Sequence, residues 1–223
     1  MLTNQSLVRK LNFLYLGGDV QRYHTLRTCQ QDTVATHSQH VAALVWLLTN
    51  GLASGALLAR ALLHDMAEQY TGDMPAPFKR QLHIEDQVDS YEQSVLRWSG
   101  LYDSVPPASV EEQRVLKLAD CLDGMLFCLR EVQARNLIME DVFWKFESYI
   151  ISLTEAETTR APHPAIYDNL IWFQDDPANS QNQSLMAVQN NMRQALCAAF
   201  NGMKGAPPDV KEILFTSSST GNK

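Results

Sequence analysis

The chain has 223 residues, of which 45% are hydrophobic, so it can bury a substantial core, and its length predicts one domain more readily than two. Its formal net charge of -7 at pH 7 argues against a surface built for nucleic-acid polymers. The apolar stretches are far shorter than a membrane span, so we expect a cytoplasmic protein with no membrane partner.

Apolar residues recur at spacings of three and four in the first part of the chain, which predicts three amphipathic helices. The stripes are Leu7, Leu11 and Leu14; Val41, Leu44, Val45 and Leu48; and Leu57, Leu58, Leu62 and Leu63. We expect Gly17-Gly18 to end the first helix and Gly51 the second, because glycine accepts the left-handed conformation common there. Ser54 is the expected N-cap of the third helix.

Further helices are predicted downstream, and strand alternation is missing, so we predict an all-α helical bundle. The stripes are Ile84, Val88, Tyr91 and Val95; Val142, Phe143, Phe146, Tyr149 and Ile150; and Leu185, Val188, Met192 and Leu196. Another helix follows Pro106-Pro107 and begins at a capping box, Ser109-x-x-Glu112. We expect a single domain over residues 1–200, an insertion at 161–184, and a partly disordered extension at 201–223.

The cysteines form no CxxC pair, and no secretory segment is recognisable ahead of them. They are Cys29, Cys121, Cys128 and Cys197. We therefore expect buried free thiols in a reducing compartment.

Three functional groups lie within one turn of each other at the end of the third predicted helix: His64, Asp65 and Glu68. A lone polar residue there would be expected on the surface, but this group directly follows an apolar run. An unpaired carboxylate near the interior would be costly, and a metal ion relieves that cost. With His37 upstream and Asp120 downstream, two imidazoles and two carboxylates suit zinc, manganese, cobalt or iron.

Two of these positions have competitors nearby. His40 lies one turn after His37 on the second helix, and we prefer His37 because His40 has an alternative as a surface or supporting histidine. Asp123 lies one turn after Asp120, and it has an alternative role as the acceptor that supports an arginine or a ligating histidine.

Five segments in a fixed order together resemble the HD-domain phosphohydrolases, and specifically their YfbR-like 5′-deoxynucleotidase branch, over roughly residues 4–155. They are Arg22-Tyr23, His37-Ser38, His64-Asp65-x-x-Glu68, Thr71-Gly72-Asp73-x-Pro75-x-Pro77-x-Lys79, and Ala119-Asp120. Phage dATP triphosphohydrolases of the DatZ type belong to the same branch, and the motifs do not separate the two groups.

The resemblance implies a role for each matching residue in the reaction. The metal ligands would be His37, His64, Asp65 and Asp120. Glu68 would orient or deprotonate the attacking water, and Asp73, in the loop after the third helix, would help to protonate the leaving oxygen.

The resemblance also implies how the substrate is bound. Arg22 and Lys79 would neutralise phosphate charge. Tyr23 stands where the family carries tryptophan, and its ring would pack against the base or sugar.

The implied activity is hydrolysis of the 5′ phosphoester of a deoxynucleotide, which is either a dNMP or a dNTP, with dATP a candidate. The implied assembly is a homo-oligomer, a dimer or larger. Two alternatives are a metal-dependent nucleotide sensor without turnover and an HD phosphodiesterase. Glu68 and Asp73 argue against the sensor, because a pure binding site has no need of them, and the Thr71–Lys79 segment disfavours the phosphodiesterase.

Overall fold

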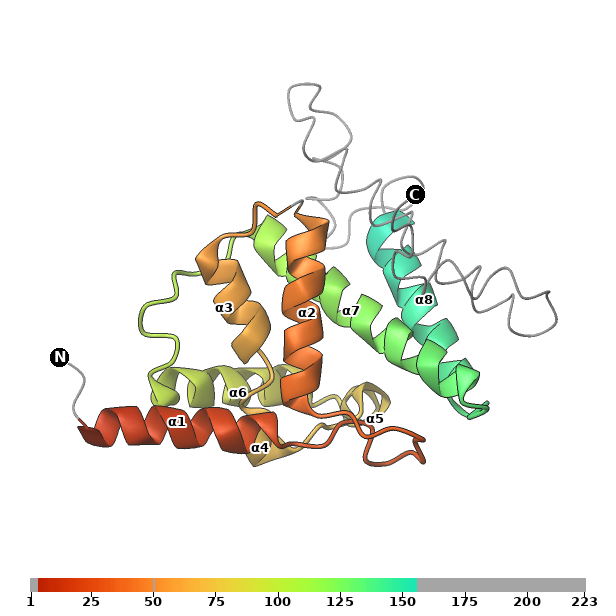
Figure 1. Cartoon of the computed structure of the whole chain (residues 1–223), viewed down its shortest axis with the longest axis horizontal. Helices are drawn as coiled ribbons and strands as arrows, with labels where there is room; N and C mark the ends of the chain where they lie inside the picture. The colour runs from red at the N-terminus through yellow and green to blue at the C-terminus, as the bar shows by residue number, and fades with distance from the viewer. Residues whose placement is uncertain (1–3, 50, 156–223) are drawn as a thin grey trace, which may run out of the picture. The chain divides into compact units, whose positions relative to one another are not determined.

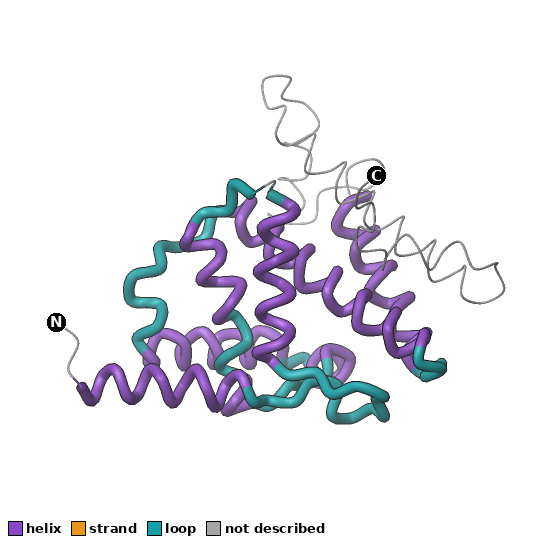
Figure 2. Tube along the Cα trace, in the orientation of Figure 1, coloured by secondary structure: helices purple, strands orange, loops and turns teal. Residues whose placement is uncertain are grey.

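The computed structural model describes residues 4–49 and 51–155, and this part of the chain is built from helices and loops (Figure 2). Its one β-type contact is an isolated antiparallel bridge between Gln21 and Thr33. The prediction of an all-α fold is therefore confirmed. The helices are α1 (Asn4–Gly18), α2 (Val34–Leu48), α3 (Gly55–Leu63), α4 (Glu68–Thr71), α5 (Ala76–Leu82), α6 (Glu85–Ser99), α7 (Val110–Gln133) and α8 (Met139–Glu155).

The chain divides into two compact units, residues 1–123 and 124–223, and α7 contributes to both. The predicted helix at Leu185–Leu196, the insertion and the C-terminal extension lie outside the described residues. The single-domain boundaries therefore stay a prediction. None of the helices in the described ranges combines the length and apolarity needed to cross a membrane.

Local hydrogen bonds explain where the helices of the first unit begin. The Ser54 side chain accepts a hydrogen bond from the Leu57 amide at 3.0 Å, which confirms it as the N-cap of α3. At the start of α7, the Glu112 amide donates to Ser109 Oγ at 3.1 Å and the Ser109 amide donates to Glu112 Oε2 at 3.0 Å. This reciprocal pair is the capping box expected from the sequence.

Glycine is required for different physical reasons at the ends of the first two helices. Gly51 has φ +78°, as expected after α2. Gly17 and Gly18 are the last residues of α1 and have no positive φ, so the expectation of a left-handed conformation is wrong there. Gly17 is instead required by close approach, since a Cβ at this position would lie 2.5 Å from Met66 O and 3.0 Å from Met66 Cα.

We expect Gly17→Ala to lower the free energy of unfolding by about 1–3 kcal/mol, because the obstructing atoms belong to backbone that must shift. Gly55→Ala is the matched control. A Cβ at Gly55, the first residue of α3, meets nothing within 4 Å, so this change should be neutral or slightly stabilising. Urea denaturation of both variants measures the difference in stability. Equal unfolding midpoints would show that the close approach of Gly17 to the Met66 backbone does not require glycine.

The segment around His64 differs from the expected single helix. Helix α3 ends at Leu63, residues 64–67 form turns, and α4 begins at Glu68. The Met66 amide donates to Leu63 O at 3.1 Å, a tighter i to i+3 pattern than that of an α-helix. The α-helix thus gives way to a tighter turn directly at the His-Asp dipeptide.

A second difference concerns the segment that follows. Gly72, with φ 72° and ψ 163°, ends α4 in a conformation essentially restricted to glycine. Asp73 lies in the loop after it, as expected from the sequence. A short helix that was not predicted from the sequence follows, α5, whose N-cap is Pro75 and which carries Lys79.

The core of the first unit lies where α1, α4 and α6 meet the start of α2. Figure 1 shows α1 and α6 running across one end of the α2–α3 pair. The buried side chains there are Phe13, Val34, Met66, Ala67, Val95 and Leu96. Met66 and Ala67 directly follow His64-Asp65. Burial of Met66 and Ala67 therefore fixes the position of the turn that carries His64 and Asp65.

In the second unit, the C-terminal part of α7 packs against α8. A Cβ at Gly124 would collide with the Phe146 ring, so the helices approach closely at this point. Phe143 is fully buried beside them.

The three cysteines in the described residues are free thiols. Cys121 and Cys128 are buried on α7, as expected. Cys29 is exposed, because it lies in the loop between α1 and α2, so the expectation of burial is wrong for this residue.

Candidate metal centre

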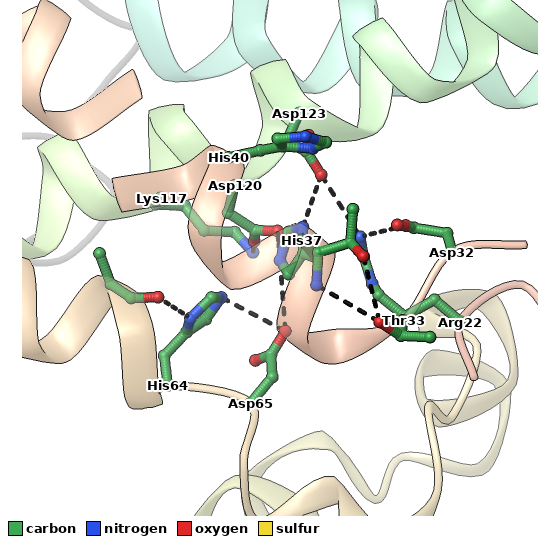
Figure 3. A network of polar contacts seen from close by, with 12 residues as sticks. Arg22, Asp32, Thr33, His37, His40, His64, Asp65, Lys117, Asp120 and Asp123 are labelled. Carbon is green, nitrogen blue, oxygen red and sulfur yellow. Dashed lines mark hydrogen bonds and ion pairs between the residues drawn. The ribbon is translucent and has the colours of Figure 1, made fainter. Parts of the chain in front are cut away.

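Four polar side chains from three segments of the first unit face one another (Figure 3). His37 comes from the first turns of α2, where it is fully buried, and Asp120 comes from α7. His64 and Asp65 come from the turn after α3. Residues separated by 83 positions in sequence, from His37 to Asp120, thus meet at one point.

Three of the four side chains place ligand-type atoms close enough to share one ion, and Asp65 contacts two of these three. Asp65 Oδ2 lies 3.3 Å from His37 Nε2 and 3.3 Å from His64 Nε2. Asp120 Oδ1 lies 3.5 Å from His37 Nε2. One ligand atom from each of His37, His64 and Asp120 lies within 4.8 Å of the others, so this group can hold a metal ion.

The hydrogen bonds behind the two imidazoles turn the same ring nitrogen toward the cluster. His64 Nδ1 lies 3.0 Å from the carbonyl oxygen of Ala61, so this nitrogen is the donor. His37 Nδ1 donates to Asp123 Oδ2 at 2.6 Å. In both rings Nε2 is left facing inward, buried and without a hydrogen bond in the described part of the chain. This arrangement fits a divalent cation, because a ligating histidine binds through one nitrogen and donates from the other.

The pKa of His37 reflects the carboxylates on both sides of its ring. Burial opposes the charged form of His37, but the hydrogen bond to Asp123 and the nearby carboxylate of Asp65 outweigh it and raise the pKa of His37 to about 9. Because Nδ1 already faces Asp123, the added proton belongs on Nε2, toward Asp65. A divalent cation would use the same nitrogen, so metal and proton compete for it.

The two carboxylates of the cluster keep their charge. Burial raises the pKa of Asp65, but the imidazoles of His64 and His37 outweigh this and hold it well below its usual range. For Asp120, burial is outweighed by Lys117 and His37, which lower its pKa to about 2. Anionic oxygens are therefore present at the point where the imidazole nitrogens converge.

Glu68, the first residue of α4, lies close enough to Asp65 for the two carboxyl groups to interact electrostatically. Burial raises its pKa to about 10, and the carboxylates of Asp65 and Asp73 add to the shift. Its Oε2 is buried and makes no hydrogen bond within the described residues. The Glu68 carboxyl group thus lies under the influence of two other acidic side chains, and a nearby cation would favour its ionised form.

Arg22 is also near the cluster, but its contacts are made behind His37. Its Nη1 lies 3.1 Å from Asp32 Oδ2 and 3.5 Å from Asp123 Oδ2, and only 10% of its side chain is exposed. Its guanidinium carbon also lies 5.2 Å from the centre of the Tyr23 ring. Arg22 therefore links the α1–α2 loop to the carboxylates beside the centre.

Tyr23 and Asp73 are joined across fifty positions of sequence. The Tyr23 backbone N–H donates to Asp73 Oδ2 at 2.7 Å, and Tyr23 has the left-handed φ of 55° that a bulky residue seldom adopts. This bond ties the α1–α2 loop to the loop after α4. The two candidate residues are therefore brought together, through backbone rather than through the phenol ring.

Lys79 is the candidate residue least connected to the cluster. No hydrogen bond or ion pair joins it to the four ligand-type residues in the ranges the structure describes. Its charge instead bears on Glu92 of α6, whose carboxylate accepts a hydrogen bond from Thr71 Oγ1 at 2.7 Å.

Two residues were missed by sequence reasoning. Lys117 Nζ lies 2.8 Å from Asp120 Oδ2, and its position three residues before Asp120 on α7 was a usable signal. Asp32, whose side chain is almost fully buried against Arg22, had no such signal, because it lies in a loop just before the N-cap of α2.

A helical protein that gathers a histidine, a His-Asp dipeptide and a later aspartate around one point has the architecture of an HD-domain protein. The family model described as 5′-deoxynucleotidase YfbR-like matches residues 13–159, well over half of the chain. The chain therefore belongs to the YfbR-like 5′-deoxynucleotidase family, and the resemblance seen in the sequence is confirmed.

Two relatives that match in sequence agree with this assignment. The 5′-deoxynucleotidase YfbR of Salmonella typhi is 30% identical over 138 residues, which span 52% of this chain and 69% of the relative. A 5′-deoxynucleotidase of Klebsiella pneumoniae is 28% identical over 141 residues, with the same shares covered. Among solved structures, the cyanophage S-2L HD phosphohydrolase DatZ, bound to dA and one catalytic Zn²⁺ ion, is 18% identical with a TM-score of 0.43, over 81% of this chain and 95% of that one.

Proposed function

We propose that this chain hydrolyses the 5′ phosphoester bond of deoxynucleotides, with a divalent transition metal held by His37, His64, Asp65 and Asp120. The observation that carries the proposal is the convergence of two inward-facing Nε2 atoms and the carboxylates of Asp65 and Asp120 in a member of the YfbR-like 5′-deoxynucleotidase family. The position of Glu68 beside them supports a centre that performs chemistry.

The donor set suits zinc, cobalt, manganese or iron, because it combines neutral nitrogen with anionic oxygen. When bound, such a cation supplies Lewis-acid polarisation of a phosphoryl oxygen and makes water easier to deprotonate. The positions left free by four protein ligands would be available to substrate and water.

In the proposed reaction, water attacks the α-phosphorus and the bond between phosphorus and the 5′ oxygen breaks. Glu68, once ionised, takes a proton from the water. Asp73 helps to deliver a proton to the leaving 5′ oxygen, so that a deoxynucleoside is released. The other product is phosphate from a dNMP or triphosphate from a dNTP.

Substrate binding is assigned to the α1–α2 loop and to α5. Arg22 would neutralise phosphate charge from its place beside the cluster, and Lys79 would do so from α5. Tyr23 would pack against the base or sugar. The contact between the Arg22 guanidinium and the Tyr23 ring supports treating these two residues as one unit.

A panel of every dNMP and dNTP, incubated with the protein and analysed by chromatography, tests the proposal. We expect release of a deoxynucleoside that depends on added divalent metal, with dATP a candidate substrate. Triphosphate as second product identifies a dNTP triphosphohydrolase, and phosphate released from dNMP identifies a 5′-deoxynucleotidase. Tight nucleotide binding with no product from any substrate would overturn the proposal and favour a sensor.

Assembly into a homo-oligomer and a cytoplasmic location stay predictions from the sequence. Static light scattering of the purified chain measures its mass in solution against the 25.1 kDa of one copy, and a mass of two or more copies is expected.

A further inference from the structure

We infer that Asp123 is a positioning residue for the metal centre: it holds His37 in the tautomer and orientation that present Nε2 to the cluster, and His40 and Arg22 hold Asp123 in turn. The inference rests on the proposed metal-dependent function, and it concerns a residue outside the four proposed ligands.

The contacts of Asp123 occupy both of its carboxylate oxygens (Figure 3). Oδ2 accepts from His37 Nδ1 at 2.6 Å, and Oδ1 accepts from His40 Nδ1 at 3.0 Å. Arg22 Nη1 also lies 3.5 Å from Asp123 Oδ2. With partners on both oxygens, the carboxylate plane cannot rotate without breaking a hydrogen bond.

The Asp123 carboxylate is buried, so its hydrogen-bond partners must come from the protein. Asp123 is 1% exposed, so its charge must be compensated by protein groups rather than by water. Arg22 supplies a positive charge, but it shares that charge with Asp32, whose Oδ2 is the closer partner at 3.1 Å. The two imidazoles therefore provide the remaining hydrogen bonds to this buried carboxylate.

A carboxylate is needed here because it accepts from both imidazoles at once. An asparagine side chain offers one acceptor and one donor, so one of the two histidines would face an N–H group. If that histidine is His37, its proton moves to Nε2 and the ring can no longer donate a lone pair to a cation. Removing such outer partners commonly weakens metal affinity by about 10–100-fold.

His40 has a clear part in this arrangement. It lies one turn beyond His37 on α2, with 33% of its side chain exposed, and its ring points at Asp123 rather than at the cluster. This placement agrees with its alternative as a supporting histidine.

The test uses the purified chain stripped of metal, Asp123→Asn as the variant, and Asp32→Asn as the matched control. Both changes remove one buried carboxylate next to Arg22, but only Asp123 contacts the imidazoles. Co²⁺ is titrated in competition with a chelator, and its visible absorption bands report the ligand geometry. We expect Asp123→Asn to raise the Kd for Co²⁺ by about 10–100-fold and to alter the bands, while Asp32→Asn stays close to wild type.

Circular dichroism accompanies each titration. If Asp123→Asn is unfolded, Asp123→Glu replaces it, because this variant keeps the charge but displaces both oxygens by one methylene; weaker Co²⁺ binding is again expected. An unchanged Kd in the folded variant, or equal weakening by Asp32→Asn, overturns the inference. Since no nucleotide is present, a wild-type chain that binds Co²⁺ but hydrolyses no deoxynucleotide refutes the proposed activity alone.

Discussion

Asp65→Ala is expected to empty the metal centre and to abolish hydrolysis of deoxynucleotides. One oxygen of Asp65 lies 3.3 Å from the Nε2 atoms of both His37 and His64, so this residue contacts both proposed imidazole ligands. Losing it removes a negative charge and a ligand together, and the geometry of the site depends on every ligand. Elemental analysis of the purified variant and a product assay measure the two effects.

Asp103→Ala is the control for this experiment. Asp103 is a surface carboxylate whose side chain is 71% exposed and whose ion pair, with Lys10, spans 3.8 Å. This variant should keep full metal content and activity, since an exposed pair of this kind contributes little. Full metal occupancy in an active Asp65→Ala protein would show that the proposed ligand set is wrong.

Glu68→Gln is expected to retain metal and nucleotide binding but to lower kcat by about 10²–10⁴-fold, the usual scale of general acid–base catalysis. Glutamine keeps the size of the side chain but cannot accept a proton from water. The prediction separates binding from chemistry, because Glu68 is adjacent to the proposed ligands without being one of them. Metal content, nucleotide affinity and single-turnover rates are measured on the same sample.

A neighbouring carboxylate provides the comparison for Glu68. Glu92 is partly buried and its charge bears on Glu68, yet its hydrogen bond is made to Thr71 Oγ1. Glu92→Gln can keep that acceptor and should retain most of the turnover. A wild-type kcat in Glu68→Gln would remove Glu68 from the mechanism, and loss of metal would make it a ligand.

Much of the fold was accessible from local patterns in the sequence. The spacing of apolar residues located α1, α2, α3, α6 and α8, and the Ser109–Glu112 capping box located α7. The side chains that cap helix N-termini were also predicted correctly, since the Ser54 cap and the Ser109–Glu112 capping box involve residues three positions apart. Such features depend on neighbours in sequence, so they need no knowledge of the tertiary structure.

The predictions from sequence were wrong where the local conformation depends on residues far away in the chain. Gly17 was assigned to a left-handed helix end, whereas its actual constraint is the backbone of Met66, 49 positions away. The break after Leu63 was also missed, because His64 to Ala67 remain compatible with helix in sequence. Burial of Met66 and Ala67 in the core of the first unit accompanies the tighter turn.

The sequence by itself determined the all-α class, the family and the set of residue types available for metal binding. It favoured His37 over His40 and Asp120 over Asp123, but helix periodicity alone did not separate them, because residues three positions apart share one face of a helix. The tertiary structure places His37 and Asp120 beside His64, and it places His40 and Asp123 behind His37. The physical reason is that the rotation of each packed helix, together with the partners of each buried polar atom, decides which side chain reaches the centre.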